Sequence, residues 1–232
     1  MGITTLSGDK PFEYLVFFDL DRTITAAVSG RVLALRAFRK GLMSKKDIVA
    51  GIILGLSYRL GIADPVKIME KMTGWVKGLP EDELSDLCRE VTFKDLLPSI
   101  HPEILEEIRM HRSKNARIVI LSTSLTEICK KVADHLQIDD IICSDLEVEN
   151  GYLTGKPEGN LCYGEEKRAR IKEYCEKYNS SPETSWYYAD AFVDFAALNY
   201  VGFPVCINPD KLLKSKAIEK GWKIYRWKAI KK

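Results

Sequence analysis

Two aspartates, one residue apart, follow a short apolar run near the start of the chain. The run is Tyr14–Phe18, and the acids are Asp19 and Asp21. A continuously apolar run of this length is typical of a strand covered on both faces, as in the parallel sheet of an α/β domain. Ligands bind beyond the carboxyl ends of such strands, so both carboxylates are expected where a substrate would lie. Two acids this close favour a hard divalent cation between them.

A group of hydroxyl side chains follows a second apolar run, 116–121. Ser122 comes directly after this predicted strand and before a predicted helix, an arrangement that can bind phosphate oxygens. The alternative is that Ser122 only caps the helix. The stretch from Ser124 to Glu127 has the spacing of a capping box, which assigns the cap to Ser124 and leaves Ser122 for a ligand.

A lysine lies in the first turns of a predicted helix from about Glu165 to Tyr178. Lys167 there opposes the helix dipole, so its position is easier to understand if an anion lies nearby. Its neighbours are charged residues typical of a solvated face. By spacing alone, that alternative is favoured.

Two more acids follow the predicted strand 186–189. Asp190 ends this strand and Asp194 lies four residues later, about one helical turn away. Such a pair can supply a metal ligand and a group that orients its surroundings. The alternative is that Asp190 is a helix N-cap.

Between the first strand and about Pro98 the pattern is helical. We expect helices over 31–40, after an N-cap at Ser44, from Asp64–Pro65 towards Val76, and from about Glu81. An α/β pattern then returns, with a helix over 102–114 that ends at Asn115. Strands are expected at 116–121, 141–143, 186–189, 205–207 and 223–225, and Asn150-Gly151 indicates a hairpin. The sequence therefore predicts an α/β core of residues 1–27 and 98–232 and an inserted helical domain of residues 28–97.

Composition limits the class of protein. The chain has 232 residues, a net charge of +2, 46% hydrophobic and 29% charged residues, which is typical of a globular protein and does not favour a nucleic-acid partner. Its six cysteines form no Cys-x-x-Cys pair, which indicates buried thiols in a reducing compartment. Residues 1–11 lack a signal-peptide core, and the apolar run 48–56 is too short to span a bilayer. We expect a cytoplasmic protein without stable membrane association.

The four groups of residues, in this order, resemble the four motifs of the haloacid dehalogenase-like (HAD) phosphohydrolases. The motifs are Asp19-x-Asp21-x-Thr23, Ser122, Lys167 and Asp190-x-x-x-Asp194. The helical insertion after the first motif, the hairpin and the segment 201–210 are similar to the phosphoserine phosphatase-like branch, subfamily IB. The resemblance covers essentially the whole chain. It implies a Rossmann-like parallel-sheet core, a helical C1-type cap and a small β-hairpin.

The resemblance also implies a mechanism. Mg²⁺ would be bound by the carboxylates of Asp19 and Asp190 and by the backbone carbonyl of Asp21. Asp19 would be the nucleophile that forms an aspartyl-phosphate, Asp21 the general acid and base, and Lys167 the group that neutralises phosphate charge. The resemblance further implies that Ser122, Thr123 and Thr23 belong to the phosphate-binding part of the site. Ser122 and the amide of Thr123 would hold the phosphate oxygens, while Thr23 and Asp194 would fix the loops and the surroundings of the metal.

The substrate is expected to be a small-molecule phosphate ester other than phosphoserine. Phosphoserine phosphatases have a glutamate soon after the first motif, and the stretch 24–30 contains no acid. Thr123 and Ala191 also differ from the residues usual in that branch. Arg31, Arg36 and Arg59 could contact an acidic leaving group, although arginines on helices are usually solvated.

Two alternatives to a phosphatase stay open at this point. A phosphotransferase or mutase would use an alcohol in place of water, and a binding protein could keep the fold without turnover. Dehalogenation is disfavoured because it needs neither metal carboxylates nor the second aspartate of the first motif. The segment 211–232 has nine basic residues and one acid, which is more simply explained by a final strand and a solvated tail than by an anionic partner. The sequence carries no signal for oligomeric state.

Overall fold

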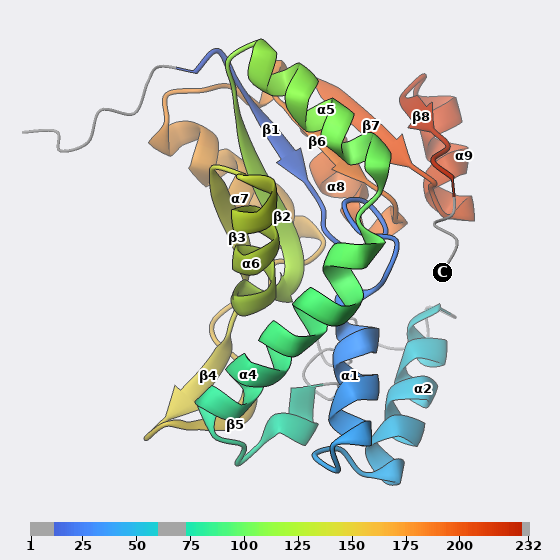
Figure 1. The fold of residues 1–232 in the computed structure, drawn as a ribbon. Helices are drawn as coiled ribbons and strands as arrows, with labels where there is room; N and C mark the ends of the chain where they lie inside the picture. Colours follow the sequence, from blue (N-terminus) through green and yellow to red (C-terminus); the bar gives the residue numbers. More distant parts are fainter. Residues whose placement is uncertain (1–11, 60–72, 229–232) are drawn as a thin grey trace, which may run out of the picture.

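A six-stranded parallel sheet forms the centre of the protein (Figure 1). The computed structural model describes residues 12–59 and 73–228. The strand order is β3-β2-β1-β6-β7-β8, and all five neighbouring pairs are parallel. The strands are β1 (Tyr14–Phe18), β2 (Ala116–Leu125), β3 (Asp140–Ser144), β6 (Trp186–Ala189), β7 (Phe203–Ile207) and β8 (Lys223–Tyr225). The predicted parallel α/β sheet is confirmed.

Strand β1 lies at the centre of the sheet because its side chains are apolar on both faces. Leu15, Val16, Phe17 and Phe18 are completely buried. Phe18 pairs with Ile120 of β2 on one side and with Tyr188 of β6 on the other. Since parallel neighbours end at the same edge, the residues that follow β1, β2 and β6 meet there.

Helices cover both faces of the sheet, and each face has its own apolar cluster. Helices α5 (Pro102–Ser113) and α6 (Thr126–Leu136) pack on one face, and α7 (Glu165–Lys177), α8 (Phe195–Leu198) and α9 (Lys211–Glu219) pack on the other. Each of these helices has apolar residues on the side turned to the sheet, such as Ile104 of α5 and Ile171 of α7, which are fully buried. Burial on both faces is what a parallel sheet of apolar strands requires.

A helical segment lies beyond the carboxyl end of β1 (Figure 1). It contains α1 (Ser29–Arg39), α2 (Lys45–Arg59), the short helix η1 (Gly74–Val76) and α4 (Glu81–Val91), followed by η2 (Thr92–Leu96) and η3 (Leu97–Ser99). Ser44 and Asp47 form the expected cap of α2, since each side chain accepts a hydrogen bond from the backbone N–H of the other. The boundaries 28–97 for a cap domain stay a prediction. The helix expected from Asp64 lies outside the described residues for most of its length.

The predicted hairpin is present and is attached to the helical segment. Strands β4 (Leu146–Glu149) and β5 (Tyr152–Pro157) are joined by Asn150 and Gly151, both with positive φ, as the turn requires. Gly78 donates its backbone N–H to the carbonyl of Leu153, and Leu153 donates to that of Leu79. The hairpin therefore extends, by backbone hydrogen bonds, into the segment that leads to α4.

Two local predictions need correction, and one helix was missed. Strand β2 runs on to Leu125 and α6 begins at Thr126, so the helix starts two residues after the predicted cap at Ser124. Lys114, not Asn115, is the C-cap of α5, and Asn115 follows it with a positive φ. Helix α9 was not predicted, because its Lys-rich sequence has a weak apolar period.

The structure also bears on the cysteines and on the question of a membrane-spanning helix. All six cysteines are free, and five of them are buried, as expected. Within residues 12–59 and 73–228, no helix combines the length and the apolar character that crossing a bilayer demands.

Candidate active site

Asp19 and Asp190 lie at the ends of neighbouring strands. Asp19 follows β1 and continues its ladder by one hydrogen bond, from its backbone N–H to the carbonyl of Tyr188 at 2.9 Å. Asp190 follows β6 directly. Both residues are 6% exposed. The two carboxylates are therefore buried together at the carboxyl edge of the sheet, where the sequence predicted them.

Lys167 joins this pair from helix α7. Its Nζ lies 2.8 Å from Oδ1 of Asp19 and 2.6 Å from Oδ1 of Asp194, and the residue is 2% exposed. Helix α7 begins at Glu165, so Lys167 lies in the first turn, as expected. The alternative of a solvated lysine is wrong, and the anions that explain its position include two carboxylates of the protein itself.

Tyr187 is part of the same network and was not identified from the sequence. Its hydroxyl donates a hydrogen bond to Oδ1 of Asp194 at 2.9 Å and accepts one from Lys167 at 3.1 Å. Nothing in a buried strand sequence distinguishes a tyrosine whose hydroxyl serves a polar site from one that only fills the core. The alternative of an N-cap at Asp190 is wrong, since Ala191 is the N-cap of η5 (Phe192–Asp194).

Burial and repulsion change the acid–base properties of these groups. Burial raises the pKa of Asp19 to about 7, with Lys167 opposing the shift and Asp194 and Asp21 adding to it. Burial, together with the charges of Asp19 and Asp194, raises the pKa of Asp190 to about 8. Burial disfavours the charged form of Lys167, but Asp19 and Asp194 outweigh this and hold its pKa well above the usual value. The site is thus an acidic cluster with a single buried cation among its described residues.

The donor set fits a hard divalent cation. Carboxylate oxygens of Asp19, Asp190 and Asp194 all lie within 4.8 Å of one another. Oxygen ligands of this kind suit Mg²⁺. Asp194 is thus the third carboxylate of this cluster. The sequence analysis instead expected the backbone carbonyl of Asp21 to bind the metal and Asp194 to lie in the surroundings of the metal.

Asp21 has its carboxylate turned to the start of α1. Oδ1 accepts a hydrogen bond from the backbone N–H of Ser29 at 2.8 Å, and Oδ2 accepts one from the Ser29 hydroxyl at 2.9 Å. Burial raises the pKa of Asp21, while the hydrogen bonds from Ser29 lower it. Ser29 was not predicted as a site residue. An isolated serine eight positions after an aspartate gives no signal of this contact in the sequence.

The hydroxyl groups in the last part of β2 are arranged differently from the prediction. Ser122 is 2% exposed, and its Oγ accepts a hydrogen bond from the backbone N–H of Ser124 at 3.2 Å. The Thr123 hydroxyl donates to the carbonyl of Cys162. Ser124 does not cap α6; its Oγ lies 2.5 Å from that of Ser29. The capping-box interpretation is wrong because the strand continues through this segment.

The remaining residues named from the sequence are Thr23 and three arginines of the helical segment. Thr23 is fully buried, and its Oγ1 has no hydrogen-bond partner in the described part of the chain. Arg36 forms ion pairs with Glu90 and Asp95, so its charge serves the packing of the helical segment. Arg31 is exposed. The side chain of Arg59 lies outside what the structure describes.

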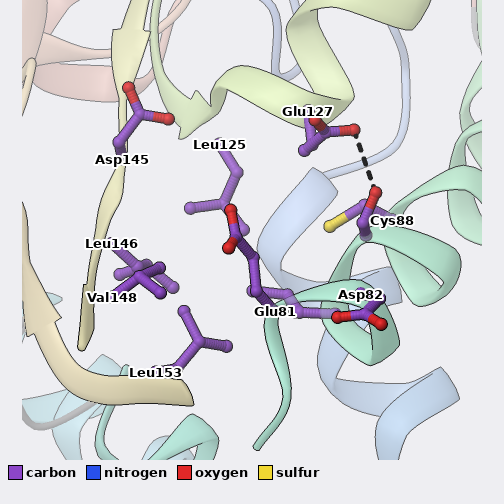
Figure 2. A pocket seen from close by; sticks show the side chains of 11 residues that line it. Glu81, Asp82, Cys88, Leu125, Glu127, Asp145, Leu146, Val148 and Leu153 are labelled. Atoms are coloured by element: carbon purple, nitrogen blue, oxygen red, sulfur yellow. Dashed lines mark hydrogen bonds between the residues drawn. The ribbon is translucent and has the colours of Figure 1, made fainter. Parts of the chain in front are cut away.

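A cavity of about 310 Å³ lies between α4, the start of α6 and the hairpin (Figure 2). Carboxylates of Glu81, Asp82, Glu127 and Asp145 surround it, together with apolar side chains such as Leu125. None of the residues at the ends of β1 and β6 lines it. The residues that line the cavity are thus different from those of the cluster around Lys167.

Comparison with curated proteins finds similar chains in several bacteria. An inhibition of morphological differentiation protein from Streptomyces azureus is 28% identical over 90% of this chain and 76% of its own length. A probable phosphatase of Mycobacterium tuberculosis is 27% identical over 90% of this chain and 73% of its own. A histidinol-phosphatase of Neisseria meningitidis is 25% identical, covering 92% of this chain and 99% of its own.

Solved structures show the same fold. A protein of unknown function from Bordetella pertussis superposes with a TM-score of 0.83 at 22% identity, covering 92% of this chain and 98% of its own. A phosphoserine phosphatase, solved as an analogue of its phospho-aspartyl intermediate, has a TM-score of 0.72 at 16% identity, covering 94% and 95%. At these identities the likeness concerns the fold. It confirms the expected Rossmann-like core.

The model of one protein family matches most of the chain. It describes haloacid dehalogenase-like hydrolases and matches residues 16–199. The match begins inside β1 and ends after Asp194, so it spans all four groups of residues that the sequence singled out. The family expected from those motifs is confirmed, and the chain belongs to the haloacid dehalogenase-like hydrolases.

Proposed function

We propose that the protein is a Mg²⁺-dependent phosphatase that hydrolyses a small phosphate monoester through an aspartyl-phosphate on Asp19. One observation carries the proposal: a buried lysine contacts Asp19 and Asp194, and carboxylate oxygens of both lie within 4.8 Å of one of Asp190. An acid at a strand end, next to a fixed cation and a cation site, is an arrangement for attack on an anionic phosphate.

The metal would be held by Asp19, Asp190 and the backbone carbonyl of Asp21, and the carboxylate of Asp194 lies close enough to take part. When bound, Mg²⁺ neutralises phosphate charge that would otherwise repel the nucleophile. Lys167 serves the same electrostatic purpose. Its ion pair with Asp194 holds the ammonium group in place, and its ion pair with Asp19 orients that carboxylate.

The remaining residues divide the chemical steps between them. Asp19 attacks phosphorus, and Asp21 protonates the leaving oxygen and later deprotonates the water that hydrolyses the intermediate. The Ser122 hydroxyl and the backbone N–H of Thr123 hold the transferring oxygens. Thr23 helps to fix the loop that carries Asp19 and Asp21, since its backbone N–H donates to the carbonyl of Leu20. These assignments follow from the motif positions together with the burial of the cluster.

The substrate class is a small alcohol phosphate other than phosphoserine. No acid occurs in residues 24–30, where an ammonium group of phosphoserine would need one. A helical cap of residues 28–97 would close over the site and select the leaving group. The six free thiols support a cytoplasmic location, and the net charge of +2 argues against nucleic acid as a partner.

Hydrolysis of p-nitrophenyl phosphate tests the proposal. We expect turnover by the native chain with Mg²⁺, loss of turnover with EDTA, and recovery when Mg²⁺ is added in excess of EDTA. Asp19→Asn should lower kcat by at least about a thousandfold, since the nucleophile is lost. Glu173→Gln is the control, because Glu173 is an exposed residue of α7 outside the cluster. Equal activity of native protein and Asp19→Asn would contradict the proposal.

A further inference from the structure

The carboxylate of Asp21 is held on both of its oxygens by one residue of the helical segment. Ser29 gives its backbone N–H to Oδ1 at 2.8 Å and its hydroxyl to Oδ2 at 2.9 Å. Ser29 is 3% exposed, so its two donors are shielded from water, whereas Asp21 is half-buried. Two bonds from one residue fix the direction as well as the position of the carboxyl group.

The start of α1 explains why this contact is favourable. Val28, the N-cap, has no polar side chain, and the first turn of α1 contains no acid. The free N–H groups and the positive end of the helix dipole therefore need an acceptor from elsewhere in the chain. Asp21 supplies it. The same interaction that caps α1 orients the proposed acid.

A second serine continues the contact on the sheet side. Oγ of Ser124 lies 2.5 Å from Oγ of Ser29, and Ser124 is 9% exposed. Since the Ser29 hydroxyl donates to the carboxylate, Ser124 must donate to Ser29. Hydrogen bonds in such a chain polarise and strengthen one another. The backbone N–H of Ser124 also contacts Oγ of Ser122, so the chain joins Asp21 to the predicted phosphate-holding segment.

We propose that Ser29, supported by Ser124, is a positioning residue that aims the proton of Asp21 at the leaving oxygen. The inference rests on the proposed phosphatase function. As the bond between Asp19 and phosphorus forms, the bond from phosphorus to the leaving oxygen breaks, and its electron pair stays on that oxygen. The proton of Asp21 then moves to the same oxygen. Each bond from Ser29 occupies one lone pair of a carboxyl oxygen and leaves another for this proton.

The need for a proton depends on the leaving group, and this gives a direct test. Nitrophenolate is a weak base and leaves readily without protonation, whereas phenolate is a stronger base and gains more from an acid. p-Nitrophenyl phosphate and phenyl phosphate have closely similar shapes, so a cap treats them alike. The measured quantity is kcat/KM for phenyl phosphate divided by kcat/KM for p-nitrophenyl phosphate.

Three substitutions remove the two donors stepwise. Ser29→Thr keeps the N–H and the hydroxyl, Ser29→Ala removes the hydroxyl, and Ser29→Pro removes both. Proline suits this position because Ser29 is the first residue of α1 and Val28 before it is extended. We expect the ratio to stay within about twofold of native for Thr, to fall about threefold for Ala, and to fall about tenfold for Pro, since misdirecting a general acid loses part of its contribution.

Ser99→Ala is the matched control. The Ser99 hydroxyl accepts from the backbone N–H of Ala27 and donates to the carbonyl of Leu96, but it does not contact Asp21. Ser99→Ala should lower stability without changing the ratio of the two kcat/KM values. If the native chain hydrolyses both esters and Ser29→Pro keeps the native ratio, the inference fails while the proposed function stands. If the native chain hydrolyses neither ester with Mg²⁺, the proposed function fails first.

Discussion

At the scale of single residues, the site depends on how a few buried charges balance. Asp19, Asp190 and Asp194 bring three carboxylates into one buried space, and Lys167 brings one ammonium group. An unpaired buried charge is strongly unfavourable, so the cluster either binds protons or binds a cation. This balance makes stability depend on pH and on divalent cations.

The first prediction concerns that dependence. Asp19 and Asp190 have folded-state pKa values of about 7 and about 8, above the value of 3.8 for an ordinary aspartate. The folded state therefore binds more protons than the unfolded state between about pH 4 and about pH 8, and stability without a divalent cation falls as pH rises through this window. Mg²⁺ replaces these protons, so it should raise Tm more at about pH 8 than at about pH 5.5.

Thermal unfolding at the two pH values, with Mg²⁺ and with EDTA, measures the effect. Asp190→Asn removes one of the carboxyl groups with a raised pKa and should weaken both the pH dependence and the Mg²⁺ effect. Asp134 is an exposed residue of α6, so Asp134→Asn should show the same pH dependence and Mg²⁺ effect as the native chain. A Mg²⁺ effect that is the same at both pH values would argue against an acidic cluster as the binding site.

The sequence predicts residues of this site to different degrees. Asp19 and Asp190 follow from apolar runs that stop at an acid, a pattern contained in the local sequence. Lys167 does not, because the charged residues around it are those of a solvated helix face, and only the motif order favours it. Ser29 and Tyr187 are beyond prediction, since their contacts depend on how distant elements approach one another.

At the scale of elements, the carboxyl edge of the sheet and the starts of helices place the reacting groups. Strands β1 and β6 fix Asp19 and Asp190, α7 carries Lys167, and α1 orients Asp21. Strand positions were predicted well because each strand is a short continuous apolar stretch of sequence, and such stretches are buried in the sheet. The start of α6 was predicted wrongly. The spacing at Ser124 is that of a capping box, but pairing with neighbouring strands extends β2 through this segment.

The hairpin supplies an element-scale prediction. Gly155 in β5 has a φ of +84°, and a Cβ there would lie 3.0 Å from Cβ of Lys77 in the helical segment. The Thr73 hydroxyl also donates to the carbonyl of Gly155. Gly155→Ala should lower the free energy of unfolding through backbone strain and through this contact, by about 2 kcal/mol in total.

Gly159→Ala separates the two causes. Gly159 has a φ of +63°, and a Cβ there would meet nothing within 4 Å. It should show the strain alone, about 1 kcal/mol. Denaturant unfolding of both variants measures the difference. If the two changes cost the same, the close approach of hairpin and helical segment does not contribute to stability.

At the scale of the whole molecule, the helical segment and the sheet share one apolar cluster. Buried residues of β1, α1, α4 and α6 belong to it, for example Val16, Leu33, Leu87 and Val132. The segment is also attached by the bonds from Ser29 to Asp21 and by the hairpin. The sequence predicted two units from a change of pattern, but the contacts that join them involve residues far apart in the chain and could not be predicted.

The central claim is that Asp19 receives the phosphoryl group and that Asp21 is needed to release it. Its most direct test is the mass of the peptide that contains Asp19 after acid quenching of Asp21→Asn with p-nitrophenyl phosphate and Mg²⁺. Nitrophenolate leaves without an acid, so we expect a burst of p-nitrophenol close to one equivalent per chain and one added phosphoryl group on that peptide. Steady turnover by Asp21→Asn, or a phosphoryl group on another peptide, would contradict the account.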